Sequence, residues 1–89
     1  MERIISAAVR IGEMIFSLPP PARHHDVLHN MSENITPGQG PTWEQGFLTT
    51  SGRFVGRREG YVLARWAGQL DHVRPKTEPL VELFSEDLW

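Results

Sequence analysis

The stretch from residue 3 to residue 21 constrains the fold most, because two apolar runs in it end at three consecutive prolines. In residues 3–11, successive side chains fall on two alternating sides of the chain, which predicts a strand. One face of that strand is expected to carry Ile5, Ala7, Val9 and Ile11. Gly12-Glu13 suits a two-residue turn, and residues 14–18 form the second apolar run. Since proline cannot donate a backbone hydrogen bond, residues 19–21 end this predicted β-hairpin.

A first helix is predicted over residues 22–34, where apolar side chains recur at helical spacing at Val27, Leu28, Met31 and Ile35. His24 falls on this stripe, which favours a hydrogen-bonded core or interface residue. His25 and His29 stand at i and i+4, a spacing that fits a metal ion, but no third ligand stands at motif spacing. We therefore expect no metal site. The sequence contains no recognisable nucleophile–base pair, so we also expect no enzyme.

The second half of the chain predicts a loop, a second hairpin and a second helix. Residues 36–41 read as the loop, and residues 46–55 as the hairpin, with Gly52 in the left-handed position of its turn. The helix is predicted over residues 58–70, with an apolar face of Val62, Leu63, Trp66, Ala67 and Leu70. The apolar tail, residues 79–89, is expected to dock. The order β-β-α-β-β-α plus a docked C-terminal tail predicts an α+β fold with a small, mostly antiparallel sheet.

The bulk composition is typical of one folded domain, here residues 1–89, with 39% hydrophobic and 22% charged residues. The sequence has no cysteine, which excludes disulfides and thiolate metal sites. Arg10 and Glu13 interrupt the N-terminal apolar run too early for a signal peptide or a membrane span. We therefore expect a cytoplasmic protein that needs no cofactor and does not contact a membrane.

Residues 52–70 gather arginines in a chain whose formal net charge is −2, namely Arg53, Arg57, Arg58 and Arg65. On a helix, Arg58, Tyr61 and Arg65 share one face. Guanidinium groups bind phosphate bidentately and stack on flat rings, and Phe54 or Tyr61 offers a ring for a base. The cluster thus predicts a nucleotide-phosphate pocket. The competing interpretation is a solvated face whose arginines pair with acidic residues and bind nothing.

Several stretches match a known group of short phage and prophage proteins. They are "IISAAVR" at 4–10, "FSLPPPARHHDVL" at 16–28, "EQGFLTTSGRFVGRREG" at 44–60, "AGQL" at 67–70 and "LFSEDLW" at 83–89. On these stretches the chain resembles the phage anti-Thoeris sponges, which sequester cyclic ADP-ribose signals of bacterial TIR-domain immune enzymes. Some sponges also hold the cyclic oligonucleotides of CBASS immunity. The resemblance implies a non-enzymatic homo-oligomer, a dimer or hexamer, that acts in the infected host cell.

The chemistry that the resemblance implies, with arginines on phosphates and aromatic groups on adenine, agrees with this arginine cluster. The phosphate candidates are Arg53, Arg57, Arg58 and Arg65, the ring candidates are Phe54 and Tyr61, and a second polar set is Arg23, His24 and His25. The chain departs from the expected acidic residue and small-residue helix start, because residues 56–61 read GRREGY. The alternative function is a phage accessory protein that binds nucleic acid or a host protein through the same basic patch. The negative net charge argues against nucleic acid.

Overall fold

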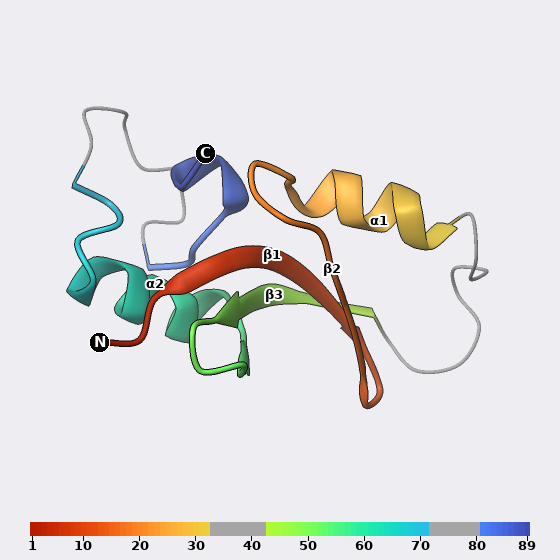
Figure 1. Ribbon diagram of the computed structural model, residues 1–89, viewed down its shortest axis with the longest axis horizontal. Helices are drawn as coiled ribbons and strands as arrows, with labels where there is room; N and C mark the ends of the chain where they lie inside the picture. Colours follow the sequence, from red (N-terminus) through yellow and green to blue (C-terminus); the bar gives the residue numbers. More distant parts are fainter. Residues whose placement is uncertain (33–42, 72–80) are drawn as a thin grey trace.

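The computed structural model describes residues 1–32, 43–71 and 81–89. Its centre is a four-stranded antiparallel sheet with the strand order β2-β1-β3-β4 (Figure 1). The strands are β1 (Ile4–Ile11), β2 (Met14–Ser17), β3 (Trp43–Thr49) and β4 (Phe54–Val55). With a helix after each hairpin, the elements follow the predicted β-β-α-β-β-α order, and the fold is α+β.

Both predicted hairpin turns are present, and each contains a glycine with positive φ. The φ angle is 59° at Gly12 and 82° at Gly52, in the region that glycine adopts without steric cost. The second hairpin is longer than expected, because β3 begins at Trp43 and not at residue 46. β1 continues to Ile11, whose partner in the ladder is Trp43, so the additional residues of β3 pair with the end of β1.

The alternation predicted for β1 is wrong at its start. A β-bulge interrupts the pairing of β1 with β3 between Ile4 and Ser6. A bulge adds one residue to one strand and shifts which side chains face the core. Ile4 is consequently buried, whereas Ile5 is exposed. Beyond the bulge the prediction is confirmed, since Ala7 and Val9 are fully buried.

The two helices are α1 (His24–Ser32) and α2 (Arg57–Trp66). α2 ends before the predicted residue 70, because Gly68 takes a φ of 73°. The Gly68 N–H donates to the carbonyl of Arg65, and the chain leaves the helix there. The predicted end of the first helix at residues 33–34, the predicted loop at 36–41 and the first residues of the predicted tail lie outside the described residues.

The apolar face predicted for α2 is wrong in part: Leu63 and Leu70 pack against the core, but Val62 and Trp66 do not. Gly60 and Ala64 form the buried side of the helix, whereas Val62 is 49% exposed and Trp66 is 74% exposed. A Cβ on Gly60 would lie 3.2 Å from the ring of Phe47 and 3.3 Å from the side chain of Leu83, which shows how closely the helix packs. Because Gly60 and Ala64 make this close contact, Val62 and Trp66, on the opposite side of the helix, face outward.

Two clusters of buried side chains form the core. The first contains Ile4, Ala7, Phe47, Val55, Ala64 and Leu83, and the second contains Val9, Val27 and Met31. The ladder puts Ala7 opposite Phe47, and Phe47 opposite Val55, so these three side chains share one face of the sheet. Val9 lies two residues after Ala7 and points to the same face. α1 and α2 therefore cover two ends of one sheet face.

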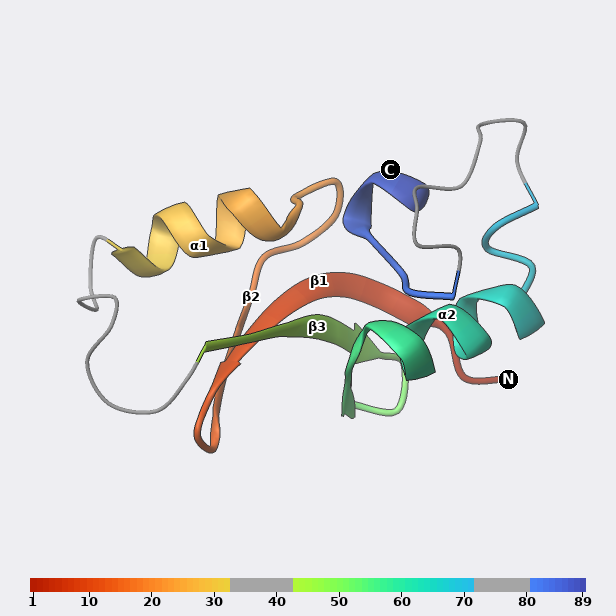
Figure 2. The ribbon, with the colours of Figure 1, turned by 180° about the vertical axis from the view of Figure 1, so that it is seen from behind.

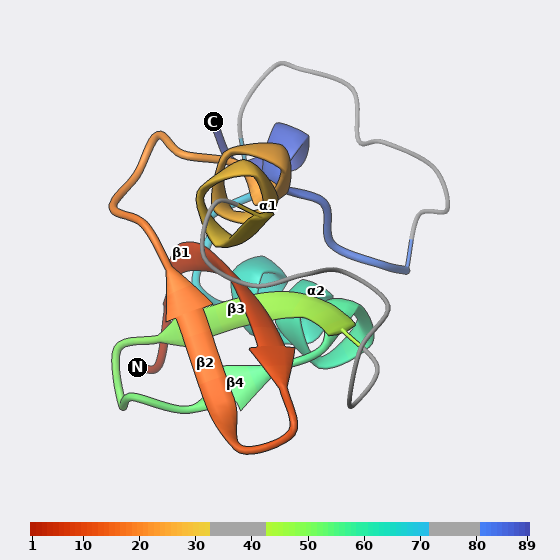
Figure 3. The same ribbon diagram turned by 90° about the vertical axis from the view of Figure 1, so that its right-hand side faces the viewer.

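The C-terminal segment docks on the rest of the chain, as predicted, and lies between the two helices (Figures 1 and 2). Leu83 is fully buried, and its N–H donates to the carbonyl of Arg57 at 2.9 Å. The short 3₁₀ helix η1 (Ser85–Asp87) follows. Figure 3 shows this segment and α1 on the same side of the strands.

Candidate functional site

Arg57 lies in the first turn of α2 and holds the C-terminal segment. Its Nη1 donates to the Leu83 carbonyl at 2.8 Å, and its Nη2 donates to Oε1 of Gln45 at 2.5 Å. The guanidinium carbon also lies 4.5 Å from the centroid of the Phe84 ring. Burial lowers the pKa of Arg57, and the nearby carboxylate of Glu86 opposes that shift. Through these contacts Arg57 holds the C-terminal segment against α2 and β3.

His24 is a buried histidine at the start of α1, as its place on the apolar stripe predicted. Its Nε2 lies 2.7 Å from the carbonyl oxygen of Gly46, and its ring meets the ring of Phe47 edge-on at 4.9 Å. Burial lowers the pKa of His24, so the neutral ring donates its Nε2 proton to Gly46. The backbone N–H of His24 donates to Oγ of Ser85 at 3.4 Å. His24 therefore links α1 to the sheet and to the tail.

The other two members of the predicted polar set do not join His24 in one site. Arg23 donates from Nε to the carbonyl of Trp89 at 2.8 Å, which fixes the last residue of the tail. Its backbone N–H donates to Oδ2 of Asp26 at 2.8 Å, within the first turn of α1. His25 is exposed, and its Nε2 lies 3.3 Å from Oδ1 of Asp26.

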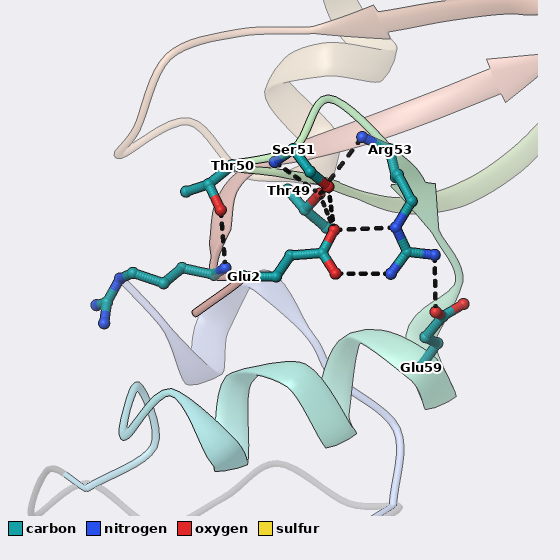
Figure 4. Close-up of polar contacts among 7 residues, drawn as sticks. Glu2, Thr49, Thr50, Ser51, Arg53 and Glu59 are labelled. Carbon is teal, nitrogen blue, oxygen red and sulfur yellow. Dashed lines mark hydrogen bonds and ion pairs between the residues drawn. The ribbon is translucent and has the colours of Figure 1, made fainter.

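Arg53 lies between two carboxylates (Figure 4). Its Nη2 and Nε donate to Glu2 at 2.7 and 2.9 Å, and its Nη1 donates to Glu59 at 3.1 Å. Glu2 also accepts the hydroxyl protons of Thr49 and Ser51. The hydrogen bond from Arg53 is the largest of the causes that lower the pKa of Glu2 to about 2. This network ties the N-terminal residues to the β3–β4 turn.

Phe54 lies on the sheet face opposite the core, because it pairs with Leu48 while Val55 pairs with Phe47. Its ring covers Gly46, where an added Cβ would come within 2.4 Å of the ring. The guanidinium of Arg10 lies 4.7 Å from the centroid of the same ring and is paired with Glu44. Phe54 is therefore packed between backbone and Arg10.

The outer face of α2 is different. A concavity of about 400 Å³ is lined by Tyr61, Val62, Arg65 and Trp66. Tyr61 packs partly against the core, while Arg65 and Trp66 are exposed. Arg58 precedes Arg65 by two helical turns on the same side. In the described parts of the chain, Arg58 and Arg65 are the arginines whose side chains make no hydrogen bond or ion pair.

The structure therefore separates the arginines that the sequence analysis grouped. Arg53 faces Glu2 and Glu59, and Arg57 faces the C-terminal segment. Arg58 and Arg65 stay on the outer face of α2. The sequence analysis missed Trp66 as a surface residue, because it assigned Trp66 to the buried side of the helix. The glycine at position 60 was the available signal, since a glycine inside a helix marks a close approach.

The described residues contain no group of three or more histidine, aspartate or glutamate side chains placed to hold a metal ion. Within the same residues, no helix has the length and hydropathy needed to cross a bilayer.

The family model described as the phage T4 y16D protein matches residues 3–89. No curated protein and no solved structure matches the chain. The match covers nearly the whole sequence, including both hairpins, both helices and the docked tail. The chain therefore belongs to the phage T4 y16D protein family.

Proposed function

We propose that this phage protein is a non-enzymatic sponge that sequesters small cyclic nucleotides on the outer face of α2. The ligands are the cyclic ADP-ribose isomers and cyclic oligonucleotides of bacterial immune signalling, as the resemblance of the sequence implies. Sequestration in the infected host cell would blunt the defence response. Binding without cleavage is sufficient for this role, provided that release of the ligand is slow.

One observation carries the proposal: an arginine that makes no hydrogen bond or ion pair with the described residues stands beside an exposed tryptophan on a concave surface. Arg65 makes no ion pair in the described parts of the chain, and Trp66 is largely exposed. The concavity of about 400 Å³ falls within the range of small-molecule sites. A guanidinium binds phosphate, and an indole stacks on a base. Arg53 and Arg57 are engaged elsewhere, so the proposal rests on Arg65 and Arg58.

The test is calorimetry and thermal unfolding with a panel of cyclic ADP-ribose isomers and cyclic di- and trinucleotides. For a ligand that binds, free ligand at about 1,000 times Kd adds about 4 kcal/mol to the free energy of unfolding. Arg65→Ala is expected to weaken binding by about 1.5–3 kcal/mol, because a charge-assisted contact is lost. Chromatography of the released ligand should return it unchanged.

Arg10→Ala is the matched control, because Arg10 is also a surface arginine but lies on the sheet. It should bind the ligand as the wild type does. Absence of binding across the panel would contradict the proposal. Retention on DNA that disappears as salt is raised would instead support the accessory-protein alternative, since phosphate contacts to a polymer are strongly salt-dependent.

A further inference from the structure

We infer that the cavity on the outer face of α2 takes a single nucleotide unit, one base with one phosphate, and does not select between purine bases. This occupancy rests on the proposed function and deepens it, because it names the part of a cyclic nucleotide that enters the protein. The cavity has a volume of about 400 Å³, and its described lining consists of Tyr61, Val62, Arg65 and Trp66. Small-molecule sites range from about 300 to about 1,000 Å³, so this cavity is one of the smaller kind.

The two aromatic rings of the lining lie at opposite sides of the cavity. Successive helical residues turn by about 100°, so Tyr61 lies about 100° to one side of Val62, and Trp66 lies about 40° to the other side. Arg65 lies about 60° from Val62, on the side of Tyr61. Around the helix, Arg65 and Val62 therefore lie between the two rings. The lining thus offers a flat base a ring on either side, with an aliphatic side chain and a guanidinium between them.

The two rings differ in how firmly they are held. Tyr61 packs partly against the core, so it forms a fixed side of the cavity. Trp66 is the last residue of α2 and is 74% exposed. Exposed side chains change rotamer on the picosecond-to-nanosecond timescale. The indole of Trp66 can therefore turn onto a base that enters the cavity, and such stacking stabilises bound nucleotides.

The charge of the lining limits the number of phosphates. Of the four described lining residues, Arg65 is the cation, and none is a carboxylate. Arg65 is exposed and makes no hydrogen bond or ion pair in the described parts of the chain. One guanidinium holds one phosphate in a bidentate contact. The lining consequently matches the base and the phosphate of one nucleotide.

The same residues carry little that could distinguish one base from another. Proteins read base edges with the amides of asparagine or glutamine, with carboxylates, or with arginine on guanine. The described lining has no amide or carboxylate side chain, and its guanidinium is assigned to the phosphate. Stacking tolerates every base, because every base has a π face. One cavity would therefore serve signals that contain adenine and signals that contain guanine.

The first experiment is an NMR titration of the whole chain with 5′-AMP, 5′-GMP, adenosine and ribose 5-phosphate, each up to about 10 mM. AMP and GMP should bind with dissociation constants within about fivefold of each other, because both stack and both carry one phosphate. Adenosine lacks the phosphate and ribose 5-phosphate lacks the base, so each should bind at least about tenfold more weakly than AMP. The indole N–H signal of Trp66, assigned with Trp66→Phe, should shift on addition of AMP. The signal of Trp89 should stay, because its Nε1 already donates to Ala22.

The second experiment pairs each variant with the fragment that lacks the matching group. In Arg65→Ala the difference in affinity between AMP and adenosine should disappear. In Trp66→Ala the difference between AMP and ribose 5-phosphate should shrink at least about threefold. Arg10→Ala is the control and should keep both differences, because Arg10 lies on the sheet. AMP binding that is unchanged in both Arg65→Ala and Trp66→Ala would overturn the assignment of the cavity.

The titrations also separate this inference from the proposed function. Binding of a cyclic nucleotide without binding of AMP would overturn the single-nucleotide site and leave the proposed function standing. Binding of AMP without binding of any cyclic nucleotide would do the reverse. A dissociation constant for GMP more than about tenfold different from that for AMP would overturn the tolerance for both purine bases.

Discussion

Arg57 and Arg58 are neighbours in the sequence and lie in the same turn of α2, yet their surroundings are opposite. The guanidinium of Arg57 is half-buried and donates to Leu83 and Gln45. Arg58 is exposed, and its guanidinium makes no hydrogen bond or ion pair in the described parts of the chain. Successive helical residues point about 100° apart, so one arginine faces the tail and the next faces solvent. Charge that is clustered in the sequence need not be clustered in space.

Trp89 and Trp66 differ in the same way, since one is packed against the protein and the other is exposed. Trp89 is partly buried, and its Nε1 donates to the carbonyl of Ala22 at 2.8 Å. Trp66 is largely exposed at the end of α2. We therefore distinguish two regions. The docking region consists of the C-terminal segment, residues 81–89, with Arg57. On the outer face of α2, by contrast, Arg58 and Trp66 are exposed.

The largest effect should come from removing the centre of the docking region. Leu83→Ala is expected to lower the free energy of unfolding by about 2–5 kcal/mol, because Leu83 is fully buried against Phe47 and α2. Urea denaturation measures the loss. Val81→Ala is the control on the same segment and should change stability by less than about 0.5 kcal/mol. A loss below about 1 kcal/mol for Leu83→Ala would show that the tail does not dock as described.

The neighbouring arginines give the next test. Arg57→Ala is expected to cost about 1–3 kcal/mol, because a hydrogen bond to Leu83 and one to Gln45 are lost. Arg58→Ala should change stability by less than about 0.5 kcal/mol. The same urea titrations compare the two variants. Equal losses for both would remove the distinction between the docking region and the outer face of α2.

Acid should weaken the docking region first, through His24. The pKa of His24 is lowered from 6.5 in the folded protein, so the unfolded chain binds more protons at acidic pH. The stabilisation is complete above pH 6.5, falls as the pH drops below that value, and levels off below the folded-state pKa. Arg57 and Glu86 face the ring with opposite charges, so their effects on it oppose each other.

The interval between pH 6.5 and pH 4.5 isolates this effect. The pKa of Glu2 is lowered from 4.5 to about 2, so the stability that depends on Glu2 is lost only below pH 4.5. Urea midpoints of the wild type should fall across the interval, while His24→Gln, which cannot titrate, should show a smaller slope. Identical slopes would mean that His24 is not held neutral.

Those parts of the fold that depend on local sequence could be predicted. The hairpins follow from apolar alternation around Gly12 and Gly52, and the helices follow from periodicity. Which side of α2 packs against the core could not be predicted from its apolar residues alone. Gly60 and Ala64 pack there because Phe47 and Leu83, from distant segments, lie against the helix. Val62 and Trp66 consequently lie on the exposed side of the helix.

The candidate site divides in the same way. His24 was predicted as a hydrogen-bonded core residue, because its place on the stripe is a local property. The convergence of four arginines was not borne out in space, since the partners of Arg53 and Arg57 are Glu2 and the tail, at opposite ends of the sequence. Such pairings depend on how distant segments meet, which helix geometry alone does not give.

The smallest effect on the fold should come from Trp66, and it sharpens the comparison of the tryptophans. Trp66→Phe is expected to change stability by less than about 0.5 kcal/mol, because the indole is largely exposed. Acrylamide quenching of fluorescence should nevertheless lose its most accessible component in this variant. In Trp89→Phe that component should remain, because the ring of Trp89 is partly buried. Quenching that is unchanged by Trp66→Phe would mean that another ring is the exposed one.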